Sequence, residues 1–318
     1  MNRKPLIACV AVGAGLCLLP LIISAPAYYW RVASLFMLAL VIASGLHLIT
    51  GMARVISLCH IALCGIGAYA AGKLTLAAGI PPLLSVVCGA AIAGLLSVVL
   101  AWITLSLEDL YLTLATLAAS EISSNVFRGW TAVTGGANGL IGVPPLSILH
   151  ISLAAPHRYF ILCTLAAVAA MALILLLDKS VFGKSLRVMG DAEILVESFG
   201  IRRDVLRLLA FGIGGALAGL AGGIAAHMDG FVGPESFGVS QSVSYLCFLV
   251  IGGLGRFRAV VIAALFAVVV SEVLRGLQGW QMVIISILAI VMLCWGSRRG
   301  SVAMMPPVAP TDPKPTLP

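Results

Sequence analysis

The sequence predicts an all-α integral membrane protein with about ten transmembrane helices and a short cytoplasmic helix between the sixth and the seventh. Three observations lead to this fold class. First, 61% of the residues are hydrophobic and 10% are charged, with a mean hydropathy of +1.13, whereas soluble domains carry about 25% charged residues. Second, apolar runs of about 20 residues, the length that crosses a bilayer, recur along the chain. Third, charge is concentrated between residues 179 and 204.

The transmembrane helices are predicted where apolar runs lie between charges and Pro or Gly breaks. The predicted spans are residues 6–25, 32–51, 56–76, 83–104, 108–127, 157–177, 205–227, 238–255, 259–275 and 279–296. The first resembles a signal peptide, but its apolar run exceeds the roughly 7–15 residues of a cleavable core, which favours an uncleaved span. The third contains "HIALCGIGAYAAGK", with three glycines and a lysine, and whether it is full, broken or re-entrant stays open.

Basic residues predict the orientation of these spans, because Lys and Arg accumulate on the cytoplasmic side. With both termini in the cytoplasm, fourteen Lys and Arg residues fall inside and five fall outside. The charged residues 179–204 are then cytoplasmic, and the net charge of +7 reflects topology rather than nucleic-acid binding. Residues 1–299 are predicted to form one membrane domain, and the Pro-rich residues 300–318 a disordered cytoplasmic tail.

Motifs for enzymatic chemistry are missing from the sequence. It contains no GxxxxGK[ST] loop, no GxSxG, no HExxH and no close pair of carboxylates within a predicted span, so we expect a transport protein rather than an enzyme. Cys59, His60 and Cys64, with His47 upstream, are residue types that bind metals, but they lack the spacing of a metal site. We expect no metal and no cofactor in this chain.

A polar stripe runs along the fifth predicted span, within "LYLTLATLAASEISSNVF" at 110–127. At about 100° per residue, Thr113, Thr116, Ser120 and Ser124 lie on one side, and Glu121 lies on the flank of that stripe. A polar stripe in a membrane helix faces either another helix, through hydrogen bonds, or a transport pathway. Both readings stay open.

Two further polar features lie near predicted helix ends. Glu272 stands close to the outer end of the ninth span, where we expect it to reach the membrane interface. The stretch "TAVTGGANGLIGVPPLS" at 131–147, which contains Asn138, is a long outside loop that connects two helices or binds a partner.

Glycines at four-residue spacing predict close helix packing. Gly215, Gly219 and Gly223 form a small-xxx-small pattern. The same packing role is expected for "GIGAYA" at 65–70, and the glycines of "IGGLGRF" at 251–257 also mark the end of a span.

The charged stretch predicts a short amphipathic helix. Gly190 is expected to interrupt the preceding turn and Asp191 to cap the helix that follows, while Gly200 suits a left-handed stop. The predicted apolar face consists of Ala192, Leu195, Val196 and Phe199, opposite Glu193 and Glu197. Such a helix lies on lipid or docks to a protein, and the acidic pair favours docking.

Several stretches together resemble the membrane permeases of ABC importers for branched-chain amino acids, of the LivM type. They are "SLCHIALCGIGAYAAG", "LYLTLATLAASEI", "TGGANGLIGVP", "FGKSLRVMGDAEILVESFGI", "LAFGIGGALAGLAGGIAAHMDGFVGPESF" and "VIGGLGRF", within residues 40–290. The resemblance implies a multi-pass protein of the bacterial inner membrane. It also implies four kinds of partner: two ATPase subunits that hydrolyse ATP, a second related permease subunit, a periplasmic solute-binding protein and membrane lipid. A homodimeric pairing stays open.

The resemblance also implies that residues 184–201 are a coupling helix on an ATPase. The residues expected to couple are Lys184, Arg187, Glu193, Leu195, Glu197, Phe199 and Gly200. Ile194 and Leu195 stand where the family usually has alanines, so the exact contacts with the ATPase stay open.

The substrate implied by the resemblance is a branched-chain or related hydrophobic amino acid. Urea, short amides and aromatic acids are alternatives on the same architecture, and a stand-alone ion-coupled secondary transporter is a further one. We expect a mostly apolar pathway without a pair of opposite charges to bind a free amino acid. The residues expected to touch the substrate or its gate are Thr113, Thr116, Glu121 and Asn138.

Overall fold

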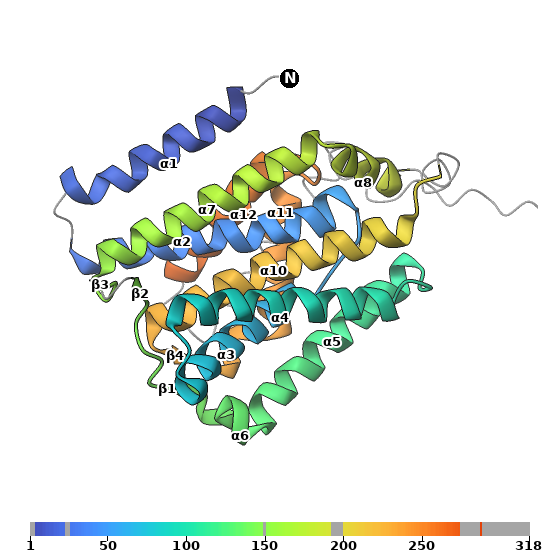
Figure 1. Ribbon diagram of the computed structural model, residues 1–318. Helices are drawn as coiled ribbons and strands as arrows, with labels where there is room; N and C mark the ends of the chain where they lie inside the picture. The colour runs from blue at the N-terminus through green and yellow to red at the C-terminus, as the bar shows by residue number, and fades with distance from the viewer. Residues whose placement is uncertain (1–3, 23–25, 149–150, 192–199, 274–286, 288–318) are drawn as a thin grey trace, which may run out of the picture.

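The computed structural model describes residues 4–22, 26–148, 151–191, 200–273 and 287. These residues are mainly α-helical, and most of the long helices run roughly side by side in one bundle (Figure 1). The long helices are α1 (Lys4–Ile22), α2 (Ala27–Leu46), α3 (His60–Ala78), α4 (Pro82–Ile103), α5 (Asp109–Gly129), α7 (Pro156–Lys179), α8 (Val181–Asp191), α10 (Arg203–Asp229), α11 (Val239–Gly252) and α12 (Arg258–Val273). The short elements are η1 (His47–Met52), α6 (Thr131–Thr134), η2 (Gly136–Asn138), β1 (Leu140–Ile141), β2 (Ser147–Ile148), β3 (Ile151–Ser152), β4 (Phe231–Val232) and η3 (Pro234–Phe237).

Five helices in the described part of the chain are long and apolar enough to cross a membrane. They are Ala27–Met52, which joins α2 to the π-helical turn η1, and the helices α3, α4, α7 and α10. These match the second, third, fourth, sixth and seventh predicted spans. Helices α1, α5, α11 and α12 lie at the first, fifth, eighth and ninth predicted spans without meeting the same criteria, and the tenth lies outside the described residues. The mainly helical, multi-span character is confirmed, and the total of ten spans stays a prediction.

Glycines bring α10 into close contact with both α3 and α4. A Cβ added to Gly67 in α3 would lie 2.3 Å from the Cα of Gly219 in α10, and one added to Gly219 would lie 2.5 Å from the Cβ of Ala93 in α4. The Oγ of Ser97 in α4 donates a hydrogen bond of 2.7 Å to the carbonyl oxygen of Phe211 in α10. The packing role predicted for these glycines is confirmed, because close backbone approach requires small side chains.

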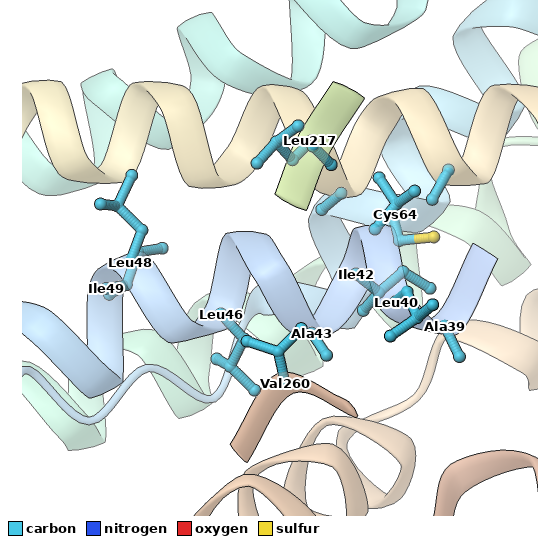
Figure 2. Packing of buried hydrophobic residues seen from close by; sticks show 14 of the residues in the cluster. Ala39, Leu40, Ile42, Ala43, Leu46, Leu48, Ile49, Cys64, Leu217 and Val260 are labelled. Carbon is cyan, nitrogen blue, oxygen red and sulfur yellow. The ribbon is translucent and has the colours of Figure 1, made fainter. Parts of the chain in front are cut away.

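Helix α2 forms the centre of the hydrophobic core. Its second half is buried on every side, and the side chains of Val41 and Ala43 have no exposed surface. Figure 2 shows α2 between two other helices, with Leu217 of α10 on one side and Val260 of α12 on the other. A helix that is apolar all round is expected in such a central position.

The chain between η1 and α3 does not continue as a helix. We call residues 53–59 the connecting segment. It begins with a reversal at Arg54, whose φ of 56° is left-handed and uncommon for a residue other than glycine. The side chains of Val55, Ser57 and Cys59 are buried. Helix α3 then begins at His60, where the Nε2 donates to the carbonyl oxygen of Ile42 at 3.0 Å, about one turn before the end of α2.

This arrangement corrects the start of the third predicted span. The helix has 19 residues from His60 to Ala78 and is entered through the buried connecting segment, whereas the prediction began the span at residue 56. The apolar character of the connecting segment made it look like the first turn of the helix. Irregular backbone is tolerated at this depth because protein surrounds it.

The long loop between α5 and α7 packs across one end of the bundle. Strand β1 pairs antiparallel with β4, with Leu140 opposite Val232, and β2 pairs with β3. Gly139 has a φ of 71°, and a Cβ there would lie 2.4 Å from the carbonyl oxygen of Val232, so both backbone conformation and space require glycine. This end, at lower left in Figure 1, is called the loop end; the opposite end carries α8.

Candidate functional site

Two threonines of the predicted polar stripe hold the connecting segment. The buried Oγ1 of Thr116 accepts a hydrogen bond of 3.1 Å from the backbone N–H of Leu58 and donates one of 2.9 Å to the carbonyl oxygen of Thr113. The Oγ1 of Thr113 donates to the carbonyl oxygen of Ile56 at 3.5 Å. Buried backbone groups outside a helix need such partners. The polar stripe was expected either to form hydrogen bonds with another element or to line a transport pathway. Thr113 and Thr116 form such hydrogen bonds.

The first turn of α3, directly after the connecting segment, is held by another hydroxyl. The Oγ of Ser242 in α11 accepts a hydrogen bond of 3.3 Å from the backbone N–H of Ile61, in the first turn of α3. Within the segment, Ser57 Oγ and Cys59 Sγ lie 3.4 Å apart in hydrogen-bonding geometry. Side chains from α5 and α11 therefore supply partners that a continuous helix would have supplied by itself.

Glu121 lies on a different face of α5 from the two threonines. Ser120 and Ser124 are buried toward the protein, whereas Glu121 is exposed beside Ile122, whose exposed fraction is 63%. Asn138 ends η2 and is exposed at the loop end. The structure therefore does not gather the four predicted pathway residues: two face inward, one faces outward from α5, and one lies in the outer loop. Their contact with a substrate stays a prediction.

Helix α8 packs against both α7 and the start of the connecting segment. An ion pair joins Arg187 in α8 to Asp178 near the end of α7, and the Oγ of Ser180 accepts a hydrogen bond of 3.1 Å from the N–H of Gly183. Lys184 is exposed. A Cβ added to Gly190 would lie 2.7 Å from the Cγ of Arg54, so α8 approaches the connecting segment closely.

Gly190 lies inside helix α8, which ends one residue later at Asp191, so the helix is not interrupted at Gly190 itself. The glycine provides room for Arg54, and the helix expected after Asp191 lies outside the described residues. Gly200 has the predicted left-handed conformation, with a φ of 73°. Four residues expected to couple, namely Glu193, Leu195, Glu197 and Phe199, lie outside the described residues.

A cavity of about 540 Å³ opens among α2, α3, α10, α11 and α12 at the loop end. It is lined by a pair of opposite charges, because Arg31 Nη2 lies 2.9 Å from Asp229 Oδ1. Glu272 also lines this cavity and accepts a hydrogen bond from Tyr28. This ion pair was not identified from the sequence, because Arg31 and Asp229 are 198 positions apart and each looks like an ordinary helix-end charge. The expectation of a pathway without a pair of opposite charges stays a prediction.

Sequence comparisons match this chain to permease components of transport systems. The family described as "Branched-chain amino acid transport system / permease component" matches residues 28–294. The high-affinity branched-chain amino acid transport system permease protein LivM of Escherichia coli (strain K12) is 26% identical over 287 residues, covering 83% of this chain and 68% of that protein. LivM of Salmonella typhimurium is 27% identical over 292 residues, with the same coverage of each chain. The autoinducer 2 import system permease protein LsrC of Yersinia enterocolitica is 28% identical over 170 residues, covering 51% of this chain and 46% of that protein. No solved structure matches the chain.

Proposed function

Because this chain belongs to the permease family of branched-chain amino acid transport systems, we propose that it is the membrane permease subunit of an ABC importer for branched-chain or related hydrophobic amino acids. The family is a transport component rather than a catalytic enzyme, and its members are multi-pass membrane proteins. In this proposal the chain has no cofactor of its own. ATP is hydrolysed by two partner subunits.

The structural observation that carries the proposal is the position of the connecting segment. At one end it lies against α8, through the close approach of Gly190 and Arg54; at the other it is bound to α5, through Leu58 and Thr116. Its backbone depends on its neighbours for hydrogen bonds, so its position follows theirs. A displacement of α8 is therefore passed to α5 through a few residues, which suits a permease driven from the cytoplasm.

We place the ATPase contact on α8 and the residues that follow it. Residues 184–201 act as the coupling helix in this proposal. The ion pair between Arg187 and Asp178 holds α8 to α7, and the exposed Lys184 is available to a partner. The solute-binding protein would deliver substrate at the loop end, where the long loop and the pair β1–β4 lie.

We place the translocation pathway along the outward face of α5, beside a second related permease subunit. Glu121 supports this placement, because a carboxylate in a membrane helix requires a polar path or a partner. The exposed apolar side chains around it, including Leu114 and Ile122, provide a surface for that subunit. A second copy of this chain is the alternative partner.

The inner-membrane location follows from the family and the apolar helices, and we propose that both termini face the cytoplasm. That orientation rests on the distribution of Lys and Arg, fourteen inside against five outside. The partial match to LsrC, a permease of an autoinducer 2 import system, shows that related permeases differ in substrate. Urea, short amides and aromatic acids are therefore alternative substrates on the same architecture.

The test is uptake into proteoliposomes that contain the chain, its second permease subunit and its ATPases, with the solute-binding protein added outside. We expect uptake of radiolabelled L-leucine that requires both ATP and the binding protein. Uptake driven by a proton or sodium gradient, without ATPase subunits, would instead show a secondary transporter and refute the proposal.

A further inference from the structure

The cavity at the loop end is lined by both apolar and charged side chains. Its walls include Leu38, Ile42 and Ile61 from α2 and α3, and Phe248 from α11. Arg31, Asp229 and Glu272 contribute charged side chains to the same cavity. A volume of about 540 Å³ is within the range of small-molecule sites, roughly 300–1,000 Å³.

The ion pair between Arg31 and Asp229 is partly exposed to solvent. The side chain of Arg31 has an exposed fraction of 55% and that of Asp229 one of 34%. A guanidinium has five N–H donors, and the bond to Asp229 uses Nη2, so Arg31 has donors left for a second anionic group. Exposed ion pairs contribute little to stability, so a ligand separates this pair at small cost.

The same ion pair also borders a second hollow. A cavity of about 390 Å³, lined among others by Tyr28, Ser34 and Tyr159, shares Arg31 and Asp229 with the first. The two charges therefore line both cavities at the loop end.

We propose that the 540 Å³ cavity is a binding site for a free amino acid with an apolar side chain. The carboxylate binds Arg31, the ammonium binds Asp229, and the side chain occupies the apolar interior. Glu272 adds negative charge at the same cavity. None of the described lining residues belongs to α5, so the cavity lies apart from the pathway proposed on that helix. The identification of the occupant as a substrate of the importer rests on the proposed function, whereas binding itself depends only on this chain.

The charges distinguish this occupant from the other substrate classes. Urea and short amides are neutral and offer no opposite charge to either Arg31 or Asp229, so they gain nothing from separating the ion pair. An aromatic acid would satisfy Arg31 but bring its carboxylate toward Asp229. Only a zwitterion complements both charges while its apolar side chain fills the interior, and a site built for two charged groups discriminates strongly against ligands that lack one.

The experiment measures equilibrium binding of radiolabelled L-leucine to the full-length chain in lipid nanodiscs. Leucinol, which lacks the carboxylate, and 4-methylpentanoate, which lacks the ammonium, are the competitors. We expect each to compete at least about tenfold more weakly than unlabelled leucine, the usual effect of losing a charged hydrogen bond. Equal competition by leucinol, 4-methylpentanoate and unlabelled leucine would show that only the apolar side chain is recognised, and would overturn the proposal.

Variants assign the binding to this cavity. Arg31→Gln and Asp229→Asn should each weaken leucine binding at least about tenfold. Ala221→Leu adds bulk to the cavity wall about two helical turns away from Asp229 and should weaken it as well. Arg128→Gln is the matched control, because Arg128 forms another exposed ion pair, with Glu235, that does not line the cavity. Unchanged binding in all three cavity variants, or an equal loss in the control, would overturn the assignment.

Parallel uptake measurements separate this proposal from the proposed function. ATP-dependent leucine uptake by the assembled importer, together with no leucine binding by the isolated chain, would overturn the cavity site and leave the importer intact. Zwitterion-selective binding that the Arg31 and Asp229 variants remove would support the cavity site even if uptake proved independent of ATP.

Discussion

The hydroxyl of Thr116 in α5 accepts a hydrogen bond of 3.1 Å from the backbone N–H of Leu58, which lies in the connecting segment and outside any helix. Replacing Thr116 with Val keeps the shape of the side chain but removes the acceptor. The buried N–H of Leu58 then lacks a partner, so we expect a loss of about 1–3 kcal/mol in the free energy of unfolding. Denaturant unfolding in detergent measures it. Ser123→Ala is the control, because the hydroxyl of Ser123 donates to the carbonyl oxygen of Ala119 in its own helix, and an equal loss there would contradict the prediction.

Gly67 and Gly219 allow α3 and α10 to touch through their backbones. Gly67→Ala would place a Cβ 2.3 Å from the Cα of Gly219, and neither backbone can move without shifting a helix. We expect a loss of about 1–3 kcal/mol in stability, the usual cost of overpacking. Thermal unfolding measures it. Gly15→Ala, where nothing lies within 4 Å of the added Cβ, should be neutral or stabilising.

Gly190 sets the distance between α8 and the connecting segment. Gly190→Leu forces α8 away from Arg54, whose Cγ lies 2.7 Å from the added Cβ. We expect ATP-dependent uptake to fall several-fold while the amount of folded chain is kept. Uptake at the wild-type rate would show that the contact between α8 and the connecting segment is not used. Gly238→Ala, with open space around it, is the control.

The ion pair between Asp178 and Arg187 holds α8 to α7. Arg187→Asp places two like charges together and should lower ATP-dependent uptake, whereas the double exchange Asp178→Arg with Arg187→Asp should restore part of it. Rescue distinguishes the pair from an ATPase contact made by Arg187 itself, since an ATPase contact would stay lost in the double variant.

Glu121 tests the proposed pathway on the outward face of α5. Glu121→Gln should impair uptake while leaving assembly with the partner subunits intact, because only the charge is removed. Glu108→Gln is the control, since Glu108 is exposed at the start of the same helix. Unchanged uptake kinetics in the Glu121 variant would remove this residue from the pathway.

Helix positions followed from the sequence where apolar runs were bounded by breaks. Helices α2, α3, α4, α7 and α10 lie close to their predicted spans, because hydrophobic length is the dominant requirement in a bilayer. The predicted glycine contacts of α10 are also present, since small residues at four-residue spacing have few other roles in membrane helices.

Features that depend on contacts between distant residues were not predictable in the same way. The connecting segment is largely apolar, and its irregular backbone is revealed by its bonds to Thr113 and Thr116 of α5. The role of Gly190 depends on Arg54, which lies far away in the sequence. The pair Arg31–Asp229 likewise joins two residues that are unremarkable by themselves.

The most direct test of the central claim, that the connecting segment passes movement from α8 to α5, is hydrogen exchange of residues 53–59 in the assembled importer. Exchange is measured with and without ATP, and the glycine-packed part of α3, residues 65–72, is the internal control. We predict that ATP changes the exchange rates of the Val55 and Leu58 amides several-fold and leaves 65–72 unchanged. If the importer hydrolyses ATP and the exchange rates of residues 53–59 are nevertheless the same with and without ATP, the claim is contradicted.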